Sequence, residues 1–152
     1  MDVEDRYANQ LFTAVAQSCE RLTAFRIELR RRPEIVEVIQ GTELRNLESG
    51  PTFETYSDAK LICRKGVTWW LEIYWDENQW SIESRVSVSN LEEDEGSIDL
   101  FEFQDRIART VPEFIALLEE ATSELIRSET LIDFSTGERI IPLQDSGMTS
   151  RN

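Results

Sequence analysis

The sequence predicts an α+β fold: a single domain with a central antiparallel β-meander of about four to six strands, a long N-terminal helix, and a second helix after the fourth strand. Two observations carry this prediction. β-Favouring segments separated by turn signals fill about residues 52–103, and apolar stripes of helical period lie on either side of them. A chain of 152 residues with 40% hydrophobic side chains suffices for one core. We expect this domain to span residues 1–143 and a flexible tail to follow over 144–152.

The first helix is predicted over about residues 3–31. Apolar side chains recur there at spacings of three, four and seven residues, which places them on one stripe. A run of three arginines and then Pro33 end the helix, because cations complement its carboxyl-terminal dipole and proline disfavours helical geometry in the preceding residue. The stripe consists of Tyr7, Leu11, Val15, Leu22, Phe25 and Leu29, widened by Phe12 and Cys19.

Residues 34–40 are apolar enough for either a short helix or a strand, and the sequence leaves both open. We expect Gly41 to end this segment and residues 41–50 to form a loop. Cys19 in the predicted helix and Cys63 in a predicted strand are interpreted as buried, reduced thiols, because two cysteines alone make no disulfide framework.

A β-meander is predicted next, with strands over 52–64, 67–75 and 80–89. Lys65-Gly66 is the expected turn between the first two. We expect Trp75 and Trp80 to flank the second turn and face each other. This register places Trp69, Leu71, Ile73, Ile82 and Val86 on an apolar face, and Trp70, Glu72, Tyr74, Glu83 and Arg85 on the opposite face.

The C-terminal third is predicted to contain a fourth strand, a helix and a short hairpin. The strand covers about residues 98–103. Thr110-Val111-Pro112-Glu113 has the form of a capping box, with the cap threonine three residues before the glutamate, and starts a helix to about Arg127. Segments 131–134 and 138–143 are expected to pair around Ser135-Thr136-Gly137.

Charge limits the class of partner. The chain has a formal net charge of −14, and residues 1–46 carry only eight acids against seven bases. Between Glu72 and Asp105 there are eleven acidic side chains and one basic side chain, Arg85. Such a field repels nucleic acid and anionic lipid and attracts basic proteins. No signal-peptide pattern and no membrane-spanning apolar run occur, so we expect a cytoplasmic protein.

The sequence indicates no catalytic chemistry, and we expect neither an enzyme nor a metal site nor a cofactor. Histidine, the commonest general base and metal ligand, is absent, and no glycine-rich phosphate loop occurs. Paired carboxylates at Glu72 and Glu83 are the one exception, with hydrated acids on an exposed sheet as the simpler interpretation. The acidic run from Glu92 to Glu95 lacks the ligand spacing of a calcium loop and is interpreted as solvated.

The remaining hypothesis is a binding protein for a basic protein partner, in which aromatic side chains framed by acids hold lysine or arginine. A small acidic neutraliser of the immunity-protein or antitoxin kind is the first interpretation. The alternatives are an adaptor or secretion-type chaperone that acts as a homodimer and, third, a carboxylate enzyme or small-ligand binder. Trp70 and Tyr74 are also compatible with a core role if a helix covers their face. The predicted contact residues are Trp70, Glu72, Tyr74, Asp76, Glu77, Glu83, Glu92, Glu93, Asp94 and Glu95.

Overall fold

The computed structural model describes residues 3–47, 50–92 and 96–140. It confirms the predicted α+β class: two long helices and a mostly antiparallel meander. In chain order the elements are α1 (Val3–Leu29), β1 (Ile35–Leu47), β2 (Gly50–Leu61), β3 (Lys65–Asp76), β4 (Gln79–Asn90), β5 (Ile98–Glu102), β6 (Arg106–Ala108), α2 (Val111–Arg127), a 3₁₀ turn (Ser128–Leu131), β7 (Ile132–Asp133) and β8 (Glu138–Arg139).

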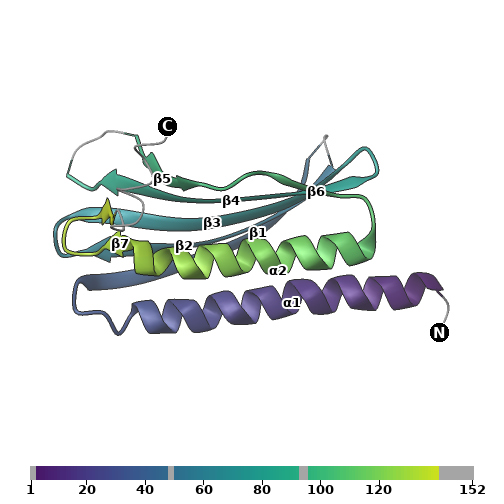
Figure 1. Cartoon of the computed structure of the whole chain (residues 1–152), viewed down its shortest axis with the longest axis horizontal. Helices are drawn as coiled ribbons and strands as arrows, with labels where there is room; N and C mark the ends of the chain where they lie inside the picture. Colours follow the sequence, from purple (N-terminus) through teal and green to yellow (C-terminus); the bar gives the residue numbers. More distant parts are fainter. Residues whose placement is uncertain (1–2, 48–49, 93–95, 141–152) are drawn as a thin grey trace, which may run out of the picture.

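The main sheet has the order β1-β2-β3-β4-β5, and β6 also pairs with β4. Figure 1 shows that both helices lie on the same side of this sheet. Helix α2 contacts β3, β4 and β6, whereas α1 contacts α2 and β1. The sheet therefore has an inner face, which packs on the helices, and an outer face, which no described helix covers.

The central hairpin of β3 and β4 has the predicted register. Trp75 lies opposite Trp80, and the pairing continues through Glu72 with Glu83 to Trp69 with Val86. Glu77 and Asn78 form the two-residue turn, and both have a positive φ, as the type I′ turns that suit the twist of a hairpin require. The assignment of side chains to two faces is therefore correct for these strands.

β1 corrects the prediction for residues 34–50. The segment is a strand, and it continues through Gly41 to Leu47 in register with β2. Gly41 does not end it: it lies opposite Tyr56, and a Cβ atom at position 41 would overlap the tyrosine ring. Gly41 therefore lies within the strand at a point where an aromatic ring packs closely against the backbone, which is one of the known reasons for a glycine inside a strand.

The turn between β2 and β3 also differs from the prediction. It is formed by Ile62, Cys63 and Arg64, with Arg64 at a φ of 67°, while Lys65 and Gly66 already belong to β3. Cys63 is consequently an exposed turn residue rather than a buried strand residue. Cys19 is half-buried, and both thiols are free, as predicted.

Helix α1 buries a narrower stripe than the sequence predicts. Leu22, Phe25 and Leu29 are buried, Leu11 and Val15 are partly buried, and Tyr7 is exposed. Phe12 was expected to widen the stripe, but it is 76% exposed. The reason is the tertiary arrangement: α1 packs on α2 and β1 with one side only, and Phe12 lies outside that contact.

Helix α2 begins as predicted. The Thr110 hydroxyl accepts a hydrogen bond from the Glu113 N–H (3.3 Å), and the Glu113 carboxylate accepts one from the Arg109 N–H (3.2 Å). The buried side of the helix, which meets the inner face of the sheet, consists of Phe114, Leu118, Ala121, Thr122 and Leu125. Trp69 is only 2% exposed; its ring meets Phe25 edge-on and its Nε1 donates to the Ser128 Oγ (3.0 Å).

The far edge of the sheet is more irregular than one predicted strand at 98–103. β5 pairs with residues 85–88 of β4, with a register shift between Val86 and Ser87, and β6 pairs with residues 80–82. β6 was not predicted. The expected C-terminal hairpin is present as β7 and β8. Residues 141–143 and the predicted tail at 144–152 lie outside the described residues, so the domain boundary at 143 stays a prediction.

Candidate protein-binding face

The outer face of the sheet brings together the central residues of the predicted binding site. Trp70, Glu72 and Tyr74 alternate along β3, and Glu83 lies on the neighbouring strand directly opposite Glu72. All four side chains are half-buried. Because both helices lie on the inner face, the alternative in which a helix covers Trp70 and Tyr74 is wrong for the described part of the chain.

Glutamates form a continuous row across four strands of this face. The registers place Glu43 opposite Glu54, Glu54 opposite Glu72, and Glu72 opposite Glu83. The guanidinium of Arg45 lies among the first three, at 3.8 Å from Glu43, 2.7 Å from Glu54 and 3.9 Å from Glu72. We call these four acids the glutamate row. Like charges directly opposite one another destabilise a sheet, so the row is a cost that packing elsewhere must offset.

The pKa of Glu72 is raised by burial and by its position among the other acids of the row. Burial raises the pKa of the Glu72 carboxyl above its ordinary value, and the charges of Glu83 and Glu54 raise it further, while Arg45 and Arg85 act in the opposite direction. The arginines therefore do not fully compensate the acids at the centre of the row. A further cation at this position would lower the pKa of Glu72 and stabilise its ionised form.

Two aromatic side chains of the outer face donate hydrogen bonds to acids of the glutamate row. The Trp70 Nε1 donates a hydrogen bond to the Glu54 Oε1 (2.8 Å), and the Tyr74 hydroxyl donates to the Glu83 Oε1 (3.1 Å). The guanidinium of Arg85 lies over the Trp70 ring, 4.1 Å from its centroid. The face thus already holds two guanidinium groups of the protein's own, one among carboxylates and one on an indole.

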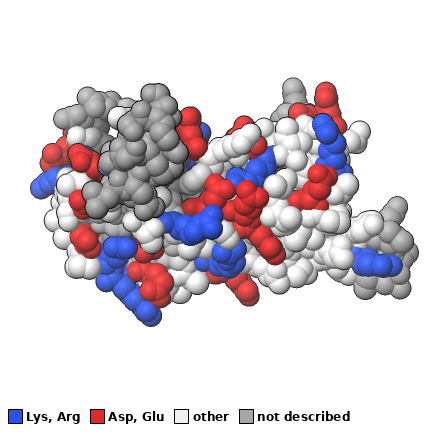
Figure 2. Space-filling view, in the orientation of Figure 1, with Lys and Arg blue, Asp and Glu red and all other residues white. Residues whose placement is uncertain are grey.

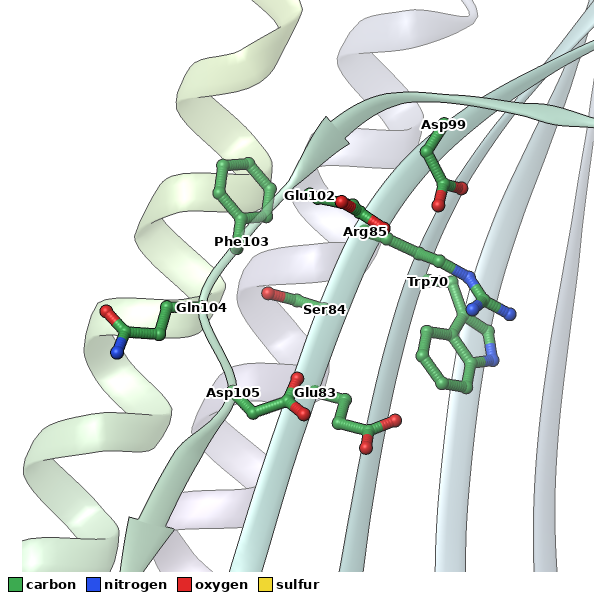
Figure 3. A pocket seen from close by; sticks show the side chains of 9 residues that line it. All are labelled: Trp70, Glu83, Ser84, Arg85, Asp99, Glu102, Phe103, Gln104 and Asp105. Carbon is green, nitrogen blue, oxygen red and sulfur yellow. The ribbon is translucent and has the colours of Figure 1, made fainter.

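A polar pocket of about 450 Å³ opens beside Trp70, where β4 is paired with β3 but has no strand partner on its other side. The gap arises because β5 ends its pairing at Arg85 and β6 begins at Ile82, so segment 103–105 leaves the edge of β4 at Glu83 and Ser84. Figure 3 shows Glu83 and Asp105 at one end of the pocket and Asp99 and Glu102 at the other. Four carboxylates thus surround it, with Arg85 as the one cation among its lining residues.

Ser84 also lines this pocket, although the register places its side chain with that of Leu71 on the inner face of the sheet. Its side chain extends from β4 toward segment 103–105 (Figure 3), and the residue is 5% exposed. The Ser84 Oγ has no hydrogen-bond partner in the structure. An unpaired buried hydroxyl costs free energy, but the Ser84 Oγ is shielded from solvent, so the pocket does not present it to a ligand.

The loop acids of the predicted site do not gather on this face. Asp76 closes the β3–β4 hairpin and Glu77 lies in its turn, whereas Glu92 follows the other end of β4. At about 3.3 Å per strand residue, these two ends are roughly 35 Å apart. Glu92 is paired with Arg64 (2.9 Å). Glu93, Asp94 and Glu95 lie outside the described residues.

Several residues of the face were missed. Glu43 and Arg45 lie in the segment interpreted as a loop, so their position on either side of the apolar Leu44, which fits the alternation of a strand, was not used. Asp105 and Glu102 could be assigned to the pocket only once the path of segment 103–105 around the edge of β4 was known. No local pattern in the sequence indicates such a gap in strand pairing.

Other kinds of site find little geometric support. Glu72 and Glu83 are adjacent as the paired-carboxylate hypothesis requires, but Glu72 is not among the residues that line the pocket. Within residues 3–47, 50–92 and 96–140, no group of three or more potential metal ligands is placed to hold an ion. None of the described helices has the length and hydropathy needed to cross a membrane.

The helical side of the molecule has a different charge pattern. Figure 2 shows acidic and basic side chains interspersed over the side that carries α2. The ion pairs agree with this picture, since Arg106 contacts both Glu120 and Glu124 of α2. Two acids of α2 therefore share one arginine, as Glu54 and Glu72 share Arg45 on the outer face.

Comparison of the chain with protein-family models, with curated proteins and with solved structures found no match.

Proposed function

We propose that this protein binds a basic protein partner through the outer face of its sheet, and that it acts as a stoichiometric inhibitor or regulator of that partner. The observation that carries the proposal is the uncovered glutamate row, three of whose four acids are half-buried, beside Trp70 and the acidic pocket. Arg45 among the glutamates and Arg85 on Trp70 are internal examples of the contacts that arginine side chains of a partner would make.

The contribution of each group differs. Acids at the rim of an interface act mainly on the rate of association, because they steer the encounter, whereas a desolvated aromatic anchor acts mainly on dissociation. Glu92 belongs to the first kind, since it is exposed and far from the centre of the face. Trp70 belongs to the second kind.

Paired capture experiments test the proposal. The wild-type protein and a variant with Glu54→Gln, Glu72→Gln and Glu83→Gln are immobilised and exposed to lysate of the native cell. The control variant carries Glu20→Gln, Glu119→Gln and Glu138→Gln, three exposed positions that are not part of the glutamate row. It has the same net charge as the first variant. We expect one basic protein to bind the wild type and the control but not the outer-face variant.

Kinetics with the captured partner then separate the roles. Trp70→Ala should speed dissociation by a factor equivalent to about 2 kcal/mol or more, while Glu92→Gln should slow association and leave dissociation unchanged. Each variant must retain the wild-type circular dichroism spectrum. Equal loss of binding by the two triple variants would mean that only net charge matters, and a neutral or acidic partner would contradict the proposal.

A further inference from the structure

The two edge strands of the sheet differ in how well they are protected against pairing with a strand of another chain. The edge at β5 and β6 is short and interrupted, features that discourage pairing with another chain. The edge at β1 is a strand of 13 residues that, within the described residues, pairs only with β2. Its protection is confined to its start, where a register irregularity lies between Ile35 and Glu37 and the Arg30 guanidinium donates a long hydrogen bond to the Val38 carbonyl (3.4 Å).

Two hydrogen bonds fix which backbone groups of β1 face outward. The Gly41 carbonyl accepts from the Thr55 hydroxyl of β2 (3.3 Å), so it points toward β2. Backbone groups of an antiparallel strand alternate in direction, so those of Val38, Gln40, Thr42 and Leu44 point toward the free edge. The bond from Arg30 to the Val38 carbonyl agrees with this assignment.

The sequence of β1 is complementary to itself in one antiparallel register. With Gly41 opposite Gly41 of a second copy, Glu37 lies opposite Arg45, and Val38 lies opposite Leu44. Shifting the two-fold axis to Gln40 would place Glu37 opposite Glu43, and shifting it to Thr42 would leave Glu37 opposite Leu47. In the Gly41 register the outward-facing groups of 38, 40, 42 and 44 form about eight backbone hydrogen bonds between the copies.

Exposed apolar side chains flank this edge. Leu44 is 76% exposed on the inner face of β1. Phe12 and Arg30 are 18 residues apart, which is five helical turns, so Phe12 lies on the side of α1 from which Arg30 reaches β1. Measured from the α1–β1 connection, Leu44 lies about 30 Å along the strand and Phe12 about 26 Å along the helix. Leu44 and Phe12 thus lie at similar distances from the connection, and both side chains are 76% exposed.

Charge favours the same surface. Residues 1–46 contain α1 and nearly all of β1 and have a net charge of −1, whereas the rest of the chain carries −13. Contact through this region brings two strongly acidic molecules together at their nearly neutral parts. We propose that β1 pairs antiparallel with β1 of a second copy of this chain, centred on Gly41, to give a two-fold dimer with a continuous sheet. This inference does not depend on the proposed function.

Sedimentation equilibrium of the full chain tests the proposal. The wild type should have the mass of a dimer. Gln40→Pro removes an outward-facing N–H and should halve the mass, while Gln40→Ala keeps that N–H and should leave the dimer intact. Circular dichroism establishes that the proline variant is folded. A monomeric wild type, or a folded Gln40→Pro variant that remains dimeric, would overturn the proposal.

Charge reversal tests the register without a proline. Glu37→Arg places like charges opposite each other at two symmetric positions. It should raise the Kd of the dimer by about tenfold or more. Combining it with Arg45→Glu restores opposite charges and should recover the dimer. Because Arg45→Glu also removes the cation that lies among Glu43, Glu54 and Glu72, the single Arg45→Glu variant is measured as a control, and all variants must be folded by circular dichroism. If the folded double variant dimerises no more tightly than either single variant, the Gly41 register is wrong.

Disulfide capture gives an independent readout. In a background with Cys19→Ala and Cys63→Ser, one preparation carries Gln40→Cys and another carries Thr42→Cys. The two positions face each other as a hydrogen-bonded pair with Cα atoms about 5.5 Å apart, within the range of a disulfide. Oxidation of the mixture should yield covalent dimers, and oxidation of either preparation alone should not. Crosslinking that is equal in all three samples would contradict this register.

Discussion

Trp69 and Trp70 are neighbours in the sequence and lie on opposite faces of one strand. Trp69 points to the helices, is 2% exposed and gives its indole N–H to a buried serine. Trp70 is half-buried on the outer face, where a carboxylate accepts its N–H and an arginine covers its ring. The same residue type thus completes an apolar core on one side and a charged surface on the other, and the difference lies in the neighbours supplied by the adjoining strands.

The largest expected effect is on the inner face. Trp69→Ala removes a fully packed ring and leaves a cavity between Phe25 and Phe134, so it should lower the free energy of unfolding by about 3–5 kcal/mol. Urea denaturation followed by circular dichroism measures the loss. A loss no greater than that of Trp70→Ala would show that the two faces do not differ as described.

An intermediate effect is expected for Trp70→Ala. The substitution removes a cation–π contact and a charge-assisted hydrogen bond but creates no closed cavity, so we expect a loss of about 1–2 kcal/mol. Arg85→Ala should cost about 0.5–1 kcal/mol, and the double variant should cost less than the sum because the contact is shared. Strict additivity in this double-mutant cycle would mean that Arg85 and Trp70 do not interact in solution.

The smallest effect is a stabilisation. The pKa of Glu72 is raised in the folded protein, so folding favours its protonated form, and stability is lost as the pH rises from the ordinary glutamate pKa of about 4.3 through the raised value. Glu72→Gln should therefore stabilise the protein by about 0.5–1 kcal/mol at pH 7, and the gain should disappear below about pH 4.3.

Glu43→Gln is the matched control, because this glutamate ends the same row and its side chain is 58% exposed. It should change stability much less at either pH. Urea denaturation of both variants at neutral and acidic pH makes the comparison. Destabilisation by Glu72→Gln at pH 7 would mean that Arg45 and Arg85 outweigh the neighbouring acids.

The face assignment of the central hairpin was predictable because alternation and turn length are local properties. Trp75, Trp80 and the residues between them determine the register, and a slip by one residue would have buried Glu72 and Glu83. Capping of α2 was predictable for the same reason, since Thr110 and Glu113 interact with each other. In both cases the partners lie within a few residues along the chain.

The errors have tertiary causes. From its neighbours in sequence, Gly41 was predicted to end the strand. In the structure the ring of Tyr56, fifteen residues later, fills the space that a side chain at position 41 would occupy, and the strand continues. Phe12 fits the helical stripe by spacing, yet only the placement of α1 beside α2 decides which side of the helix is buried. The pocket depends on the gap in pairing along β4, which is set by the whole path of residues 98–108.

All four tryptophans of the chain lie in the β3–β4 hairpin. Trp75 and Trp80 meet edge-on with centroids 4.6 Å apart at its turn, and Trp80 also contacts Phe114 of α2. Intrinsic tryptophan emission is therefore a spectroscopic probe of this hairpin alone and contains no direct signal from α1 or β1. Detachment of α1 would be visible by circular dichroism, while the emission would change only through Trp69, whose ring meets Phe25 of that helix.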